Sequence, residues 1–122
     1  MTYFDGFVIA VENARKQEFI DHAQKTDRFF REHGATRVVE GWGDDVPEGK
    51  VTDFRRSVQA KEGEGVVFSW IEWPDKATRD AAMKKMIEDP RMDPSTPGNP
   101  PMPFDGKRMI FGGFVPVVEV KA

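Results

Sequence analysis

Two histidines are the side chains of this sequence best suited to acid–base or metal chemistry. His22 and His33 lie within residues 14–33, where apolar residues recur at helical spacing, and both belong to the stripe that would face a sheet. Eleven residues separate them, a rise of roughly 16 Å along a helix axis, so they cannot bind one metal ion together. Either one alone could be a general base or an axial haem ligand, or a hydrogen-bonded residue at the edge of a core. We keep His22 as a catalytic candidate and predict no metal site.

Glu72 is the second catalytic candidate. It lies in Val66–Trp73, a run of β-branched and aromatic residues that predicts a strand, and it alternates onto the same face as Phe68 and Trp70. Burial beside aromatic rings would raise the pKa of its carboxyl group and make it an acid or base. The alternative is an exposed carboxylate at the rim of a core. In a cleft between helix and sheet, Trp70 and Phe19 are the candidate walls for an apolar ligand.

A charged cluster follows the proline-rich segment. Asp105, Lys107 and Arg108 surround Gly106 and could bind an anion or a substrate carboxylate. The alternative is a turn that starts the last strand and pairs with the acidic loop at 43–53. That loop, with Asp44, Asp45 and Asp53, lacks the ligand spacing of an EF-hand, so we expect a solvated turn rather than a cation site.

Composition limits the classes of protein that this chain can be. The 122 residues carry a net charge of −3, which gives no electrostatic reason to expect nucleic acid or an anionic membrane as a partner. The chain has no cysteine, which excludes disulfides, thiolate zinc sites and cysteine nucleophiles and agrees with a reducing cytoplasm. No apolar run approaches the ~20 residues that span a bilayer, and the first residues do not resemble a signal peptide. We therefore expect a cytoplasmic protein.

The order of predicted elements indicates a ferredoxin-like α+β sandwich, an antiparallel sheet with two helices on one face, forming one domain over residues 1–122. Asn13 is the expected N-cap of the first helix, and Asp75 that of the second. Residues 90–103 hold six of the nine prolines and predict an extended loop. The expected strands are 3–11, 36–42, 54–60, 66–73 and 107–118, and the expected helices are 14–33 and 75–88.

Apolar residues occupy both faces of the first, central and last predicted strands, yet two helices can cover only one face of a sheet. The second face would present ~700 Å² of apolar surface, more than the ~300–600 Å² of the largest patch on a typical monomer. A second copy of the same sheet is the simplest cover and gives a two-fold homodimer. The alternative cover is the proline-rich loop folded over that face.

Several blocks of this sequence resemble the YbaA-like family of small bacterial proteins of unknown function. The resemblance covers nearly the whole chain and implies a member of the dimeric α/β-barrel superfamily, whose ferredoxin-like subunits pair sheet to sheet. It implies no reaction. The blocks are Asp5–Val8, Gly43–Phe54, Val66–Ile71, Asp89–Met92 and Met102–Phe114.

Three functions follow from these features, and the sequence leaves open whether the protein is an enzyme. The first is a homodimeric binding or structural module without chemistry of its own. The alternative is a small monooxygenase- or isomerase-like enzyme, cofactor-free or haem-linked, with an apolar substrate in the helix–sheet cleft. The third, RNA binding on an open sheet, rests only on an aromatic strand at Phe111–Val115. We expect the homodimer, with a small apolar ligand as a possible second partner, and we expect no cofactor, nucleic acid or membrane partner.

Overall fold

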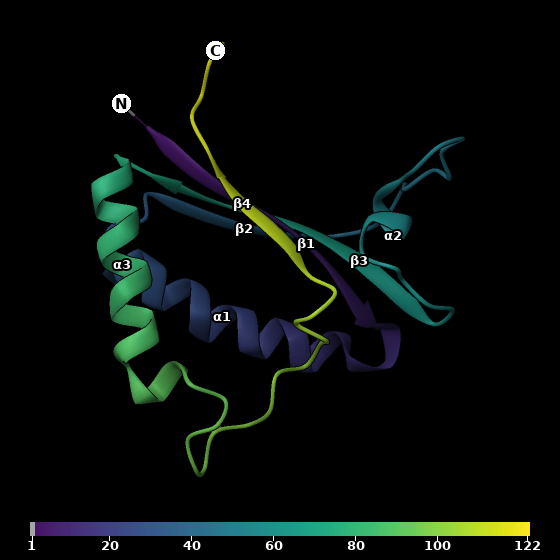
Figure 1. The fold of residues 1–122 in the computed structure, drawn as a ribbon, viewed down its shortest axis with the longest axis horizontal. Helices are drawn as coiled ribbons and strands as arrows, with labels where there is room; N and C mark the ends of the chain where they lie inside the picture. The colour runs from purple at the N-terminus through teal and green to yellow at the C-terminus, as the bar shows by residue number, and fades with distance from the viewer. Residues whose placement is uncertain (1) are drawn as a thin grey trace.

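The computed structural model describes residues 2–122 and shows a four-stranded antiparallel sheet with the strand order β2-β3-β1-β4 (Figure 1). This order, with one long helix after β1 and another after β3, is the ferredoxin-like arrangement that the sequence predicts. The elements are β1 (Tyr3–Glu12), η1 (Asn13–Arg15), α1 (Lys16–Glu32), β2 (Arg37–Trp42), α2 (Phe54–Ser57), β3 (Glu64–Trp73), α3 (Lys76–Glu88), η2 (Pro90–Met92) and β4 (Ile110–Phe114).

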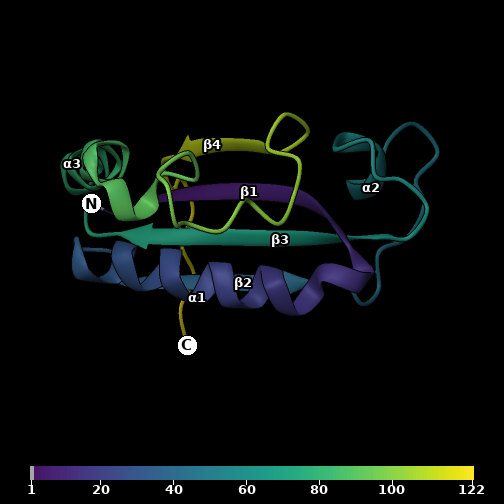
Figure 2. The same cartoon turned by 90° about the horizontal axis from the view of Figure 1, so that it is seen from below.

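Both long helices lie on the same face of the sheet, and the short α2 lies on the other (Figures 1 and 2). Alternation along the two central strands explains the core between them. Ile9 and Val11 of β1, and Val67, Ile71 and Trp73 of β3, point toward the helices. The apolar stripe of α1 meets them with side chains that are almost fully buried, namely Phe19, Ala23, Phe29 and Phe30.

The ends of the helices follow local capping chemistry. An Asp75 carboxylate oxygen accepts a 2.7 Å hydrogen bond from the Thr78 N–H and so begins α3 as predicted. Gly34 ends the first helix with a φ of +108°, and a Cβ there would lie 2.5 Å from the Thr78 methyl group. The N-cap predicted at Asn13 is wrong, because a 3-10 turn from Asn13 to Arg15 precedes α1 and no side chain caps its first turn.

The strand predicted over residues 54–60 is also wrong, because this segment forms the helix α2. Asp53 stops the extended chain: its carboxylate accepts from the backbone N–H of Arg56, at 2.7 Å, and of Gly49, at 3.1 Å. The apolar pair Phe54 and Val58 suits a helical turn, since residues four apart share one face. Val58 is buried against Val8, Ala10 and Val66 at one end of the sheet. The spacing of Phe54 and Val58 fits both the alternation of a strand and the turn of a helix, and the hydrogen bonds of the Asp53 cap select the helix.

The last strand is shorter than predicted, since β4 covers 110–114 rather than 107–118 and pairs only with Phe4–Val8 of β1. A Cβ on Gly113 would lie 2.1 Å from the Tyr3 hydroxyl and 2.4 Å from an Arg79 nitrogen, so a larger residue there would displace the Tyr3 and Arg79 side chains.

One buried carboxylate joins β1, β3 and α3. Asp5 accepts a 2.9 Å hydrogen bond from the Trp73 indole N–H and two-pronged hydrogen bonds from Arg79, the shortest also 2.9 Å. The Arg79 guanidinium also lies 5.0 Å from the centre of the Tyr3 ring. Because Asp5 and Trp73 are both buried, this charge is compensated almost entirely from within the protein.

We expect Asp5→Ala to lower the free energy of unfolding by about 3–5 kcal/mol, because it removes the buried partner of the Arg79 charge and leaves the buried Trp73 N–H without an acceptor. The control is Asp80→Ala, which removes the exposed partner of the same arginine, 2.7 Å away, and should cost less than about 1 kcal/mol. Urea unfolding at one fixed protein concentration measures both. Equal losses in the two variants would show that the buried contact has no special role.

Candidate functional site

The sheet face opposite α1 and α3 is a continuous apolar floor. The strand register places side chains of β1, β3 and β4 next to one another on this face, with the Phe4 and Phe114 rings stacked 5.7 Å apart and the Phe68 and Trp70 rings 5.9 Å apart. Phe68 is 46% exposed and Phe114 is 52% exposed. We call this surface the open face; its large side chains are Phe4, Val8, Phe68, Trp70, Ile110 and Phe114.

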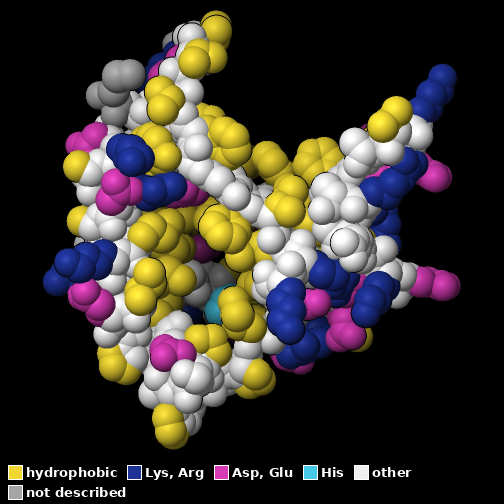
Figure 3. Space-filling view, in the orientation of Figure 1, with side chains coloured by type: hydrophobic (Ala, Val, Ile, Leu, Met, Phe, Trp, Pro, Cys, Tyr) yellow, Lys and Arg dark blue, Asp and Glu magenta, His cyan; other side chains and the backbone are white. Residues whose placement is uncertain are grey.

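The open face is concave. It borders a hollow of about 960 Å³ whose lining also includes Pro116 and Val118 of the segment that follows β4. Figure 1 shows α2 and its loops rising at one end of the sheet and the C-terminal segment rising from the same face, and Figure 3 shows hydrophobic side chains gathered between them. Phe54 of α2 packs edge-on to Phe68, at 5.7 Å between ring centres. The walls and the floor are thus both apolar.

Two predicted site residues lie on this face. The Trp70 indole N–H donates a 2.9 Å hydrogen bond to the Glu72 carboxylate, which also lies 3.9 Å from Arg37. Glu72 is half-buried at the rim, where an ion pair and a hydrogen bond satisfy its charge. The helices, and His22 with them, are on the other side of the sheet, so the structure does not bring His22 together with Trp70 and Glu72.

His22 faces the proline-rich segment rather than the sheet. Its ring lies edge-on to Phe104, 5.9 Å between centres, and burial followed by the nearby Lys25 charge lowers its pKa. Around it is a cavity of about 310 Å³ between α1 and the proline-rich segment, lined by methionine and proline side chains of that segment and by polar and charged side chains, several of them from α1. Phe19 is buried one turn earlier, against Trp42 and Phe104, so it is a core residue.

The proline-rich segment therefore covers α1 and leaves the open face free, which overturns the alternative that it folds over that face. The Asn99 side chain holds its loop together by donating 2.8 Å hydrogen bonds to the carbonyl oxygens of Pro90 and Asp93. In Figure 2 the segment runs from α3 to β4 on the helix side of the sheet.

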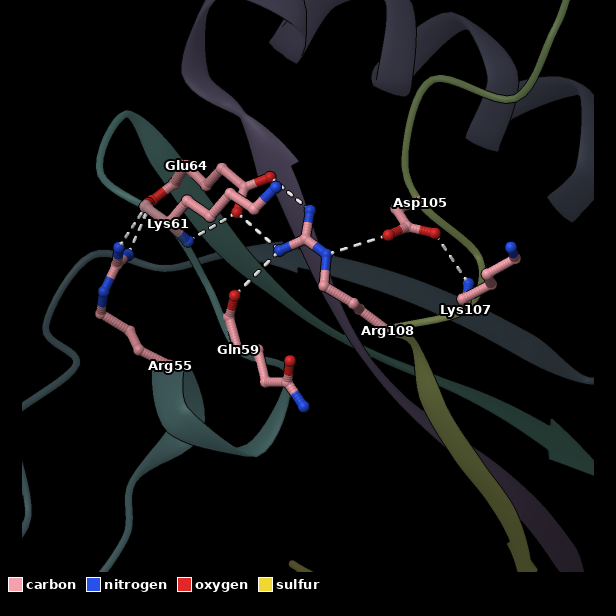
Figure 4. A network of polar contacts seen from close by, with 7 residues as sticks. All are labelled: Arg55, Gln59, Lys61, Glu64, Asp105, Lys107 and Arg108. Carbon is pink, nitrogen blue, oxygen red and sulfur yellow. Dashed lines mark hydrogen bonds and ion pairs between the residues drawn. The ribbon is translucent and has the colours of Figure 1, made fainter.

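The charged cluster at 105–108 is a structural network, shown in Figure 4. Arg108 forms a two-pronged ion pair with the buried Glu64, both distances 2.7 Å, and also donates to Asp105 at 3.1 Å and to the Gln59 carbonyl at 3.0 Å. These contacts hold the pKa of Glu64 near 2, with the Arg108 hydrogen bonds as the main cause. Lys107 contributes its backbone N–H to Asp105. The Arg108 guanidinium is occupied within the chain, and its main partner is Glu64 rather than the acidic loop.

A pair of carboxyl groups under α1 was missed from the sequence. Asp27 and Glu40 contact each other between α1 and β2, beside Ser69. Burial, and then the Asp27 charge, raises the pKa of Glu40 to about 8, and burial raises the pKa of Asp27 to about 6. The pair therefore retains a proton near neutral pH. The positions of the two residues in the sequence could have revealed the pair. Asp27 follows Ala23 by one helical turn, and Glu40 alternates with Val38 and Trp42 onto the side of the sheet that faces the helices.

Other sites receive no support from residues 2–122. Within that range no three histidine or carboxylate side chains are grouped so that they could hold a metal ion. No helix of the same residues is long and apolar enough to cross a membrane.

The fold and the open face define a ferredoxin-like α+β protein with one sheet face uncovered. A family model described as "Protein of unknown function (DUF1428)" matches residues 2–106, and the chain belongs to this family. It is 54% identical over 119 residues to the "Uncharacterized protein YbaA" of Escherichia coli K12 and of Shigella flexneri, over 98% of this chain and 99% of each relative. The predicted YbaA-like family is thus confirmed.

A solved structure has the same fold. It is described as a dimeric ferredoxin-like protein from an uncultured marine organism, and it aligns with a TM-score of 0.60 and 14% identity, over 98% of this chain and all of that one. At this identity the likeness concerns the fold alone.

We expect stability to fall as the pH rises from about 5 to about 8, because the folded chain holds a proton at Asp27 and Glu40 that the unfolded chain releases. Glu40→Gln should remove most of this dependence and make the variant more stable than the parent at pH 8.5, as measured by urea unfolding. The lowered pKa of His22 acts in the opposite direction between its folded value and its ordinary value, so the difference between variant and parent isolates the pair.

The exposed Glu62→Gln is the control and should keep the slope of the parent. A Glu40→Gln variant with an unchanged slope would mean that the pair ionises freely in the folded state.

Proposed function

We propose that this protein is a homodimeric binding or structural module in which the open faces of two copies pack against each other. The observation that carries the proposal is the concave apolar surface itself, with its aromatic floor and apolar walls. A surface of this kind that closes on a copy of itself gives an isologous two-fold interface, the commonest oligomer of soluble proteins.

The exposed area supports this pairing only when the C-terminal segment is included. The floor side chains expose roughly 400 Å² of apolar surface, less than the sequence predicts, because Val58 covers one end of the sheet. The valines at 115, 117, 118 and 120 raise the total to roughly 800 Å², which equals the share of one partner in a standard protein interface.

The distribution of charge and the structural likeness also support it. Three charged residues, Glu72, Glu119 and Lys121, line the hollow beside its apolar side chains, and interfaces likewise combine an apolar core with a polar rim. The similar solved structure is described as dimeric, and a shared fold makes the same pairing available to this chain.

A second candidate function is binding of a small apolar molecule in the cavity of about 310 Å³ beside His22. Ligand pockets begin near this volume and are mostly apolar with a few polar groups. His22, with its lowered pKa, is neutral at pH 7 and could accept or donate a proton there. This cavity is where an enzymatic activity on an apolar substrate would be placed, separate from the dimer face.

For the dimer, we expect the protein to have the mass of two chains at micromolar concentration in sedimentation equilibrium. Phe68→Asp should place a charge in the centre of the interface and produce a folded monomer, with at least a tenfold weaker association. The control is Ile87→Asp, which changes an exposed apolar residue of α3 on the helix side and should remain dimeric. A monomeric parent protein would refute the proposed pairing.

For the cavity, we expect indole to shift the methyl resonances of Met92 and Met102, which line it, in NMR spectra of methyl-labelled methionine. Met83 of α3, which does not line the cavity, is the control and should not move. If millimolar indole leaves Met92 and Met102 unshifted, the cavity does not bind small aromatic molecules.

A further inference from the structure

The segment after β4 has the composition of a strand but no strand partner in its own chain. Residues 115–121 read Val-Pro-Val-Val-Glu-Val-Lys, and β-branched residues such as valine favour strands. Val117 is 92% exposed, Val118 is 81% exposed and Val120 is 90% exposed. Each large apolar side chain left in water in this way gives up the favourable free energy that burial would provide. We call residues 115–121 the C-terminal arm.

The arm makes almost no contact that would hold it against its own sheet. Pairing between β1 and β4 ends at Phe4 and Phe114, and no backbone hydrogen bond joins the arm to any residue from 2 to 122. Pro116 has no N–H to continue the ladder. The ion pair of Lys121 with Glu119, at 3.0 Å, lies within the arm itself.

The arm points toward the place where a second copy would lie. It leaves the sheet on the side away from α1 and α3, and Pro116, Val118 and Glu119 line the hollow of the open face (Figure 1). The area estimate adds to this, because the floor alone exposes about half of what one side of a standard interface buries. A dimer that left the arm in water would not bury the second half of that apolar area.

An unpaired strand edge of matching length is available on that second copy. Strand β2 lies at the edge of the sheet, and the backbone hydrogen bonds of Arg37–Trp42 go to β3 on one side only, among residues 2–122. Six residues of β2 span ~20 Å and seven residues of the arm span ~23 Å. The other free edge, β4, is shorter and contains Gly112 and Gly113, which makes it a poorer template.

We propose that the C-terminal arm of each copy adds as a strand to the outer edge of β2 of the partner, so that the two chains exchange arms across the interface. This inference rests on the proposed dimer. The exchange provides hydrogen-bond partners for the backbone groups of the arm and of the outer edge of β2, and it buries the valines of the arm. Peptide-binding domains that add an extended peptide to a sheet edge use the same kind of strand addition. The dimer is then held by main-chain hydrogen bonds as well as by the aromatic floor.

The first test separates backbone pairing from apolar contact. Val118→Pro removes an N–H and a strand conformation, and Val118→Ile keeps both with a similar side chain. We expect Val118→Pro to weaken dimerisation at least tenfold in sedimentation equilibrium, and at concentrations that keep it dimeric to speed hydrogen exchange of the amides of Val38–Trp42 at least tenfold. Val118→Ile should match the parent in both measurements.

The second test measures a contact between the two chains and does not depend on weakening the dimer. The natural chain has no cysteine, so Ala122→Cys gives one attachment point for a nitroxide. Spin-labelled chain at natural isotope abundance is mixed with ¹⁵N-labelled parent chain, and only amides of the partner report the label. We expect the strongest broadening in the amides of one end of β2. Strongest broadening in β4, or none in β2, overturns the exchange.

The two proposals fail in different ways. A monomeric parent protein refutes the dimer and the arm exchange together. A dimeric parent whose Val118→Pro variant associates as tightly, with unchanged exchange in β2, leaves the dimer standing and refutes the arm exchange alone.

Discussion

The apolar side chains on both faces of this sheet favour burial away from water. The two long helices, however, cover one face only. The asymmetry follows from the connections: α1 joins β1 to β2 and α3 joins β3 to β4, each a pair of parallel, non-adjacent strands, and both crossovers pass over the same face of the sheet. The core against α1 and α3 is therefore complete within one copy, whereas the opposite floor receives only the short α2 at one end. Everything proposed for the open face follows from this difference in coverage.

Buried charge has a positional role in this fold. Asp5 connects β1 to a helix 74 residues later, and Arg108 connects the start of β4 to a carboxylate 44 residues earlier. A buried ion pair contributes little net stability compared with an apolar replacement, but its loss on one side leaves an expensive unpaired charge. Such pairs penalise any packing of α3 or β4 that shifts them by a few ångströms. The position of the strand that carries the arm is fixed in this way.

Much of the fold could be predicted from alternation and caps. The two-sided apolar patterns of Tyr3–Val11 and Val66–Trp73 placed these strands at the centre of the sheet, and Asp75 fixed the start of α3. The segment after Asp53 could not be settled by pattern, because Phe54 and Val58 fit both a strand and a helical turn, and the hydrogen bonds of one aspartate decided it.

The site was less predictable, because it depends on which face each side chain reaches. Trp70 and Glu72 share a face by alternation, as predicted, but that face is opposite the helix that carries His22. Arg108 could be recognised as an ion-pairing residue, yet its partner Glu64 is defined only by the path of the chain around α2. The Asp27 and Glu40 pair was hidden because each residue alone looks like an ordinary surface charge.

The order of the strands also has a consequence for synthesis. Of the four strands, the central strand β1 is the first to leave the ribosome, and its neighbours β3 and β4 follow only much later in the sequence. Since pairs so distant in sequence form slowly, a nascent chain carries β1 with one bare edge until β4 has also been synthesised. Within β1, Asp5 on the helix side and the neighbouring Gly6 keep that edge from being a uniformly apolar template for neighbouring nascent chains.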